Sequence, residues 1–248
     1  MKKVLLVLLF ITGGLLAGEI NIAVAANVSY AMDELKSEFA KNNPETTVRV
    51  TLGSSGKLTA QIKNGAPYGI FMSADMIFPQ ALYEDKIATT KPVMYAQGAL
   101  AFLSIHSQDY SKGMKLLEDA KIDKIAIANP KTAPYGTAAI EAMQTSGVYE
   151  NIKNKLVFAE SISQTVSYAV TAAQIGLIAK SSLYSPQMSQ YKENIHWADV
   201  DASLYSPIDQ GVVLLKYGAE NKEYKAFYDF ILSDKAKEIF RRYGYIVR

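Results

Sequence analysis

Four loops of this 248-residue chain carry small hydroxyl or amide side chains, and each comes just before a segment with helical periodicity. They are residues 26–29 (ANVS), 53–57 (GSSGK), 129–136 (NPKTAPYG) and 160–163 (ESIS). The first turn of a helix has N–H groups without partners inside the helix and about half a positive charge. Several such helix ends brought together would bind an anion without any charged side chain.

The same residue types also allow other interpretations. Ser, Asn and Thr are preferred helix N-caps, so each loop taken alone is typical of ordinary capping. A serine hydrolase would need a G-x-S-x-G turn and a base, but residues 53–56 are one residue too short and His106 and His196 lie outside the four loops. Tyr243 and Tyr245 could ligate ferric iron as phenolates, although packing with a polar tip is the simpler interpretation.

The elements that must position these loops are short apolar runs that alternate with helical patterns. Strands are expected at residues 20–26, 48–52, 70–72, 99–105, 125–128, 156–159, 175–179 and 212–215. Helical spacing lies between most of them, and two further helical patterns close the chain. This alternation predicts an α/β fold with parallel strand–helix–strand units, in which ligands bind beyond the carboxyl ends of the strands.

The length suits one large domain or two lobes of roughly 100–130 residues each. The chain shows no internal repeat and no linker rich in Pro, Gly or Ser, so two lobes would be joined by short extended crossings. The best candidates for these crossings are Tyr95-Ala96 and Tyr205-Ser206. We therefore expect lobe I at residues 19–95 plus 206–248 and lobe II at residues 96–205.

Composition excludes several classes of protein. Cysteine is absent, which removes thiol catalysis, disulfides and thiolate-bound metals, and two histidines are too few for a multi-histidine metal site. Lys and Arg total 26 against 24 Asp and Glu, so there is no broad electrostatic footprint for nucleic acid. With 49% hydrophobic and 20% charged residues, the chain has the composition of a folded globular protein.

Residues 1–18 (MKKVLLVLLFITGGLLAG) have the layout of a secretory signal peptide. Two lysines precede an apolar run over residues 4–11, and the small residues Ala17 and Gly18 follow. The run is shorter than the roughly 20 residues of a transmembrane helix, and no cysteine follows it for a lipid anchor. We expect cleavage near Ala17 or Gly18 and a soluble periplasmic product, since the periplasm permits disulfides without requiring them.

Taken in order, several segments resemble periplasmic molybdate-binding proteins of ABC importers. They are IAVAANVSYAMDEL, GSSGKLTAQIKNGAP, FMSAD, IANPKTAPYGTAAIEAM, AESISQTVSYAV and KAFYDFILSDKAKEIFRRYGYIVR. Together they span essentially the whole chain after the signal peptide. The resemblance implies a two-lobed α/β solute-binding protein, in which each lobe is a mostly parallel sheet flanked by helices and the ligand occupies the cleft between the lobes.

The resemblance also implies which residues would contact the oxyanion. The serine of the family's first loop falls on Asn27, and that of the second loop falls on Ser55, beside Ser54. Backbone N–H donors fall on Tyr135 and Ile162. With Ser29 of the first loop included, the expected ligand set is Asn27, Ser29, Ser54, Ser55, Tyr135 and Ile162.

One position departs from the family pattern in a way that removes a donor. A family tyrosine that donates its hydroxyl falls on Ala179 here. The Asn27 amide, with two donor hydrogens, and the Tyr135 hydroxyl are the two candidates to replace it. We expect Asn27 to donate directly to the anion.

By resemblance, the protein captures molybdate, and also tungstate, in the periplasm and delivers it to a membrane permease. We expect a monomer without catalytic activity, cofactor or nucleic-acid partner, which binds molybdenum as its oxyanion and not as a free cation. A receptor for another oxyanion or for ferric ion is the alternative within transport. An exported serine hydrolase is the alternative from a different class.

Overall fold

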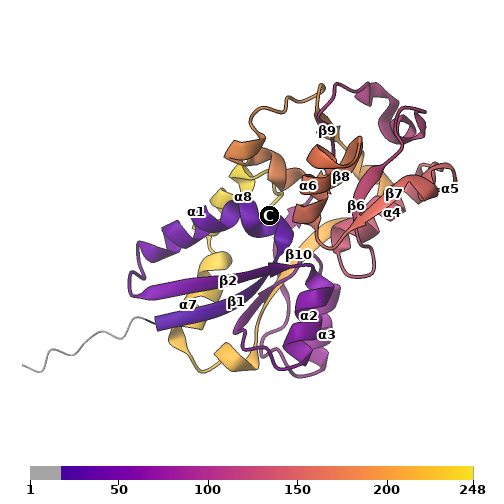
Figure 1. Ribbon diagram of the computed structural model, residues 1–248. Coiled ribbons are helices and arrows are strands. Elements are labelled where there is room, and N and C mark those ends of the chain that lie inside the picture. The colour runs from indigo at the N-terminus through magenta and orange to yellow at the C-terminus, as the bar shows by residue number, and fades with distance from the viewer. Residues whose placement is uncertain (1–17, 248) are drawn as a thin grey trace, which may run out of the picture.

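The structure is a computed structural model that describes residues 18–247, and it contains two five-stranded sheets in two lobes (Figure 1). The expected two-lobed α/β architecture is confirmed. Residues 1–17 of the predicted signal peptide lie outside the described residues, so its cleavage stays a prediction. Between residues 18 and 247, no helix has both the length and the hydrophobicity needed to span a bilayer.

The first sheet has the strand order β2-β1-β3-β10-β4. Its strands are β1 (Gly18–Ala25), β2 (Thr46–Gly53), β3 (Ile70–Met72), β4 (Val93–Gly98) and β10 (Ile208–Leu214). β1 runs parallel to β2 and β3, whereas β10 runs antiparallel to β3 and β4. The sheet is therefore mixed, with its parallel half formed by the first strands of the chain.

Helices cover both faces of the first sheet. α1 (Ser29–Ala40), α7 (Lys222–Ile231) and α8 (Asp234–Arg242) pack on one face, and α2 (Ser55–Lys63) and α3 (Ile77–Glu84) pack on the other. Side chains alternate along β1, so Ile20, Ile22 and Val24 join the core with α1 while Ala23 joins the core with α2. Burial of both faces explains why this strand is apolar without interruption from Ile22 onward.

The second sheet has the order β7-β6-β8-β5-β9. Its strands are β5 (Leu100–Leu103), β6 (Ile125–Ala128), β7 (Leu156–Ala159), β8 (Ile175–Ala179) and β9 (Trp197–Asp199). β6 runs parallel to β7 and β8, and β5 runs antiparallel to β8 and β9. The helices of this lobe are α4 (Pro134–Thr145), α5 (Tyr149–Ile152) and α6 (Ile162–Thr171).

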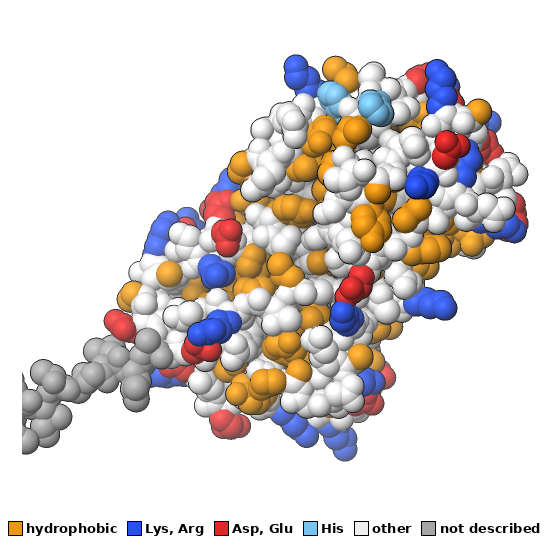
Figure 2. Space-filling model, in the orientation of Figure 1, with side chains coloured by type: hydrophobic (Ala, Val, Ile, Leu, Met, Phe, Trp, Pro, Cys, Tyr) orange, Lys and Arg blue, Asp and Glu red, His pale blue; other side chains and the backbone are white. Residues whose placement is uncertain are grey.

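Short 3-10 segments connect these elements in the described chain. They are η1 (Ala26–Val28), η2 (Tyr110–Glu118), η3 (Lys153–Lys155), η4 (Lys180–Tyr184), η5 (Pro186–Met188), η6 (Ala202–Leu204) and η7 (Lys216–Gly218). On the face shown in Figure 2, basic and acidic side chains are interspersed, as their nearly equal numbers predict.

The chain crosses from the first sheet to the second at Ala99, which separates β4 from β5, and returns between β9 and β10. Tyr95 and Ala96, the expected first crossing, lie within β4, where Ala96 pairs with Gln210 of the first sheet. The sequence patterns missed β4, which mixes polar and apolar residues, and β9, which has only three residues. The exact lobe limits stay a prediction, since sheet pairing alone does not define where a lobe ends.

Candidate functional site

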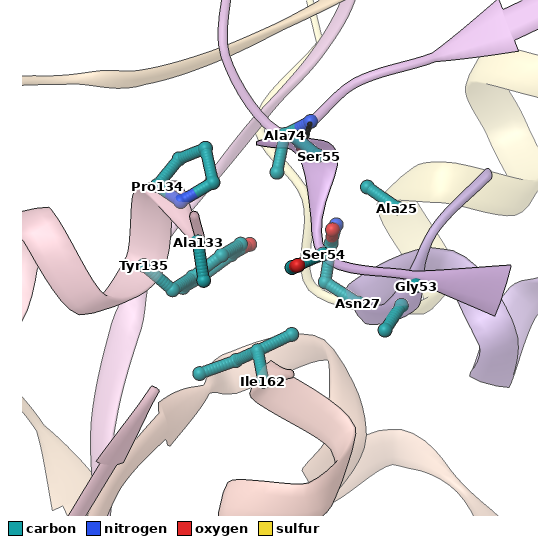
Figure 3. Close-up of a pocket in the computed structure, with 11 residues that line it drawn as sticks. Ala25, Asn27, Gly53, Ser54, Ser55, Ala74, Ala133, Pro134, Tyr135 and Ile162 are labelled. Atoms are coloured by element: carbon teal, nitrogen blue, oxygen red, sulfur yellow. Dashed lines mark hydrogen bonds between the residues drawn. The ribbon is translucent and has the colours of Figure 1, made fainter. Parts of the chain in front are cut away.

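A pocket lies where loops from both lobes meet (Figure 3). It is lined by Ala25, Ala26, Asn27, Gly53, Ser54, Ser55, Ala74, Ala133, Pro134, Tyr135 and Ile162. Five of the six residues expected as ligands are therefore brought together: Asn27, Ser54, Ser55, Tyr135 and Ile162. No residue in this lining has a charged side chain.

Strand register explains why the first two loops meet. Ala25 at the end of β1 pairs in parallel with Gly53 at the end of β2, so both strands end at the same edge of the sheet. The chain turns directly into η1 after β1 and into α2 after β2. Ser54 is the N-cap residue of α2, and its side chain makes no capping hydrogen bond.

The second lobe repeats this arrangement at the ends of β6 and β7. Ala128 pairs with Ala159, and the loops that follow lead into α4 and α6. α4 begins with Pro134, which suits the first position of a helix because no N–H is needed there. The following N–H, that of Tyr135, has no partner inside the helix, and the same holds for Ile162 at the start of α6.

Two serine hydroxyls of the pocket have hydrogen-bonding capacity left for a ligand. Ser55 Oγ accepts a hydrogen bond from the Ala74 N–H at 2.9 Å, which leaves its own hydrogen to donate. Ser54 Oγ is buried, and within residues 18–247 it has no hydrogen-bond partner. Leaving such a group unpaired costs about 1–3 kcal/mol, so an acceptor atom in the pocket would stabilise the site.

Direct contacts hold the two lobes together around the pocket. Ser163 Oγ donates to the Ala26 carbonyl at 2.7 Å, and the Gly56 N–H donates to the Thr132 carbonyl at 2.8 Å. Lys57 of α2 forms an ion pair with Glu160 across the lobes, with both side chains about half exposed. The charges of this pair therefore lie at the surface, while the pocket itself is neutral.

Behind the pocket, Asn27 belongs to a buried hydrogen-bond network. Its Nδ2 atom donates to Gln210 Oε1 and to Tyr245 Oη, at 2.9 Å each. The Tyr95 hydroxyl lies 2.8 Å from Gln210 Oε1, and Gln210 Nε2 donates to the Tyr135 hydroxyl at 3.1 Å. Burial raises the pKa of all three tyrosines above the ordinary value, so they are protonated and neutral.

The remaining candidates lie elsewhere. Ser29 does not line the pocket, and its hydroxyl lies 3.4 Å from that of Ser163. Ala179 ends β8 outside the lining, and its carbonyl accepts a hydrogen bond from Ser182. The Tyr135 hydroxyl faces Gln210 in the core, while its backbone begins α4 at the pocket.

The two tyrosines considered as iron ligands diverge. Tyr245 points inward and donates its hydroxyl hydrogen to the Asn27 carbonyl at 2.9 Å. Tyr243 is less buried, and burial together with the neighbouring Glu34 raises its pKa. The two hydroxyls therefore lie in different environments. This arrangement agrees with ordinary packing of both tyrosines and not with a shared metal site. Neither histidine lines the pocket, so the serines there have no imidazole base.

Sequence reasoning missed Gln210, Tyr95, Tyr245 and the Ala74 N–H as parts of this site. Gln210 could have been found, because it directly precedes the apolar run of β10 at residues 211–214, and a polar residue needs partners when it is buried there. Tyr95 and Tyr245 resemble ordinary core aromatics in sequence. Only the tertiary structure shows that their hydroxyls converge on the two amides.

The two lobes, the inter-lobe pocket and its helix N-termini define a class of solute-binding protein. The family model described as "Bacterial extracellular solute-binding protein" matches residues 20–246, and the chain belongs to this family. Within the class, the chain is 40% identical to the molybdate-binding protein ModA of Rhodobacter capsulatus, over 93% of this chain and 89% of that protein. It is 33% identical to ModA of Azotobacter vinelandii, over 92% of this chain and 90% of that protein.

Structural comparison gives the same result. The solved periplasmic molybdate-binding protein of Azotobacter vinelandii matches with a TM-score of 0.84 at 30% identity, covering 92% of this chain and 99% of that one. The resemblance to molybdate-binding proteins noted in the sequence is therefore confirmed over nearly the whole described chain.

Proposed function

We propose that the protein captures molybdate in the periplasm and delivers it to the membrane permease of an ABC importer. The observation that carries this proposal is the pocket between the lobes, which combines buried hydroxyl and backbone donors with no charged side chain. The names of the similar proteins support molybdate as the anion. We propose that the protein acts as a monomer and without catalysis.

The donor set suits a doubly charged oxyanion whose oxygens are all acceptors. We propose that Ser54 and Ser55 donate their hydroxyls, that Tyr135 and Ile162 donate their backbone N–H groups, and that Asn27 donates its amide. Hydrogen bonds to an ionised acceptor are about twice as strong as neutral ones, so dipoles alone can balance the charge. Without Lys or Arg in the lining, release to a permease stays possible.

Selectivity would follow from size and from protonation. Tungstate is nearly the same size as molybdate and should bind with similar strength. Sulfate is smaller and would leave two or three donors without a partner, each at a cost of about 1–3 kcal/mol, which amounts to orders of magnitude in affinity. Phosphate carries a proton near neutral pH and needs an acceptor that the proposed donor set lacks.

Calorimetric titration of the mature protein with molybdate, tungstate, sulfate and phosphate tests this function. We expect tight, similar binding of the first two anions and much weaker binding of the other two. The matched control is Ser146→Ala, which removes a hydroxyl outside the pocket, at the end of α4, that donates to the Met143 carbonyl. Equal affinity for sulfate and molybdate would overturn the molybdate assignment.

We also propose that the lobes close on the ligand by a hinge at the two crossings between the sheets. The contacts between Ser163 and Ala26 and between Gly56 and Thr132 would form on closure. Small-angle scattering should show a smaller radius of gyration after molybdate is added. An unchanged profile would mean that the lobes are already closed without ligand.

A further inference from the structure

The hydrogen bonds of the Asn27 amide do not fit its proposed role as an anion donor. Both Nδ2 hydrogens are used inside the protein, on Gln210 and Tyr245. The Oδ1 atom is left without a partner among residues 18–247, although the side chain is fully buried. An oxyanion such as molybdate presents only acceptor oxygens. In this orientation Asn27 could therefore not donate to it.

Two tyrosines around Gln210 show a related mismatch. Tyr95 has one hydroxyl hydrogen but two acceptors in reach, the Ser73 carbonyl at 3.1 Å and Gln210 Oε1 at 2.8 Å. Tyr135 accepts from Gln210 Nε2, and among the described residues no acceptor takes its own hydrogen. All three mismatches depend on which way the two side-chain amides are turned.

Turning both amides by 180° removes these mismatches. The N and O atoms of an amide are similar in size, so the heavy-atom distances are kept while donors and acceptors exchange places. Gln210 Nε2 then donates to Tyr95 Oη and to Asn27 Oδ1, and Gln210 Oε1 accepts from Tyr135. Asn27 Nδ2 takes the place of the unpartnered Oδ1 and has two hydrogens free for a ligand.

The contacts on the far side of Asn27 accommodate the same rotation. Tyr245 donates its single hydrogen to Asn27 Oδ1 in place of the Asn27 carbonyl. That carbonyl keeps the hydrogen bond from Ser181 Oγ at 3.1 Å. Each buried acceptor among these residues therefore keeps a hydrogen bond after the rotation.

The rotated chain of hydrogen bonds has a fixed direction because it starts at a backbone carbonyl, which can only accept. Ser73 takes the hydrogen of Tyr95, so Tyr95 must accept from Gln210, and Gln210 in turn donates to Asn27. The fold leaves space for this chain at Gly98. A Cβ atom there would lie 2.0 Å from Tyr135 Oη and 2.6 Å from Gln210 Nε2.

We infer that Gln210 is a positioning residue of the anion site: it holds the Asn27 amide with Nδ2 toward the bound oxyanion. This inference rests on the proposed function. With Nδ2 forward, the pocket presents donors only and selects an oxyanion that carries no proton. With Oδ1 forward, it would present an acceptor and favour a protonated oxyanion such as hydrogen phosphate. Gln210 thus sets the protonation state that the pocket accepts without touching the ligand.

A double-mutant cycle tests this role, with Gln210→Glu and Tyr95→Phe made in the parent and in an Asn27→Ser background. A carboxylate at position 210 can only accept, so it forces Asn27 Oδ1 toward the pocket. A serine hydroxyl rotates freely and does not need Gln210. We expect Gln210→Glu to weaken molybdate binding at least about tenfold more in the parent than in the Asn27→Ser background.

Tyr95→Phe is the uncharged version of the same test and covers the case in which Gln210→Glu does not fold. It should weaken molybdate binding about threefold to tenfold in the parent and less than twofold beside Asn27→Ser. The ratio of molybdate to phosphate affinity should fall in both single variants. A merely structural role would lower both affinities together and would not depend on residue 27.

Equal losses in the two backgrounds, or no loss in either variant, would overturn the role of Gln210. The parent titration separates this outcome from failure of the proposed function. A parent that binds sulfate and not molybdate would refute the molybdate assignment, and the cycle would then be measured with sulfate. A parent that binds none of the four anions would refute both proposals.

Discussion

The two halves of the proposed anion site supply different kinds of donor. The first lobe contributes the buried side chains of Asn27, Ser54 and Ser55. The second lobe contributes the starts of α4 and α6, where Tyr135 and Ile162 offer backbone N–H groups and place their own side chains in a packed core. One half therefore depends on residue identity, and the other depends on where helices begin.

This difference indicates where the pocket can be changed. A side-chain donor is lost by a single substitution, whereas a backbone donor survives any substitution that leaves the helix in place. Mutations in the first lobe should accordingly reduce anion binding much more than conservative mutations in the second lobe. The predictions below use calorimetric titration with molybdate unless another measurement is named.

The largest effect is expected for Ser54→Ala combined with Ser55→Ala. Each hydroxyl bound to an ionised acceptor is worth about 1.5–3 kcal/mol, so the double variant should bind molybdate at least about a hundredfold more weakly. Ser146→Ala, at the far end of α4, is the control and should bind like the parent. Retention of parental affinity by the double variant would show that the first-lobe half does not depend on its hydroxyls.

A smaller loss is expected for Asn27→Ala, at roughly tenfold to a hundredfold, because one donor to the anion is removed. Asn27→Ser should keep most of the affinity, since a hydroxyl can supply the same hydrogen bond. Thermal unfolding of both variants checks that the fold is kept. If Asn27→Ala binds as tightly as the parent, the site relies on Ser54, Ser55 and backbone donors alone.

Conservative substitutions in the second-lobe half of the pocket should change molybdate affinity only slightly. Ile162→Val keeps the backbone donor and the start of α6, so molybdate affinity should change less than about threefold. Tyr135→Phe removes only a hydroxyl that faces Gln210, and it should cost about threefold. A loss as large as that of Asn27→Ala from Ile162→Val would erase the proposed distinction between the two halves.

The smallest effect is expected for Lys57→Ala, which breaks the exposed ion pair with Glu160. Its two side chains are 52% and 62% exposed, so solvent and salt screen the attraction. We expect less than about a twofold change in affinity at physiological salt, and a smaller one at high salt. A tenfold loss would mean that surface charge, and not neutral donors, attracts the anion.

Much of the fold was readable from local sequence because its signals are local. The buried strands β6 and β8 are continuous apolar runs, as is β1 from Ile22 onward, and helical spacing follows β1. β4 and β9 were missed because they lack a clear local pattern. β4 lies at the edge of its sheet with exposed and buried residues mixed, and β9 is too short for a pattern.

The sequence likewise predicted one part of the candidate site and not another. The loops 26–29, 53–57, 129–136 and 160–163 were identified because each carries small polar residues before a helix, and the structure brings them to one pocket. Ser29 shows the limit of this reasoning, since belonging to the right loop did not place its hydroxyl in the lining. A loop's sequence shows that it can bind, but side-chain direction depends on the turn that it forms.

By itself, the sequence determined most of the order of strands and helices, the neutral and cysteine-free chemistry, and the loops that start helices, because each depends on residues close together in the chain. The tertiary structure alone decided what surrounds Asn27. Gln210 lies 183 positions away and Tyr245 lies 218 positions away, yet each lies 2.9 Å from its side-chain amide. Such contacts arise only when β10 and the C-terminal segment pack beside the end of β1. In this buried network, the donor or acceptor role of one group then fixes the role of the next.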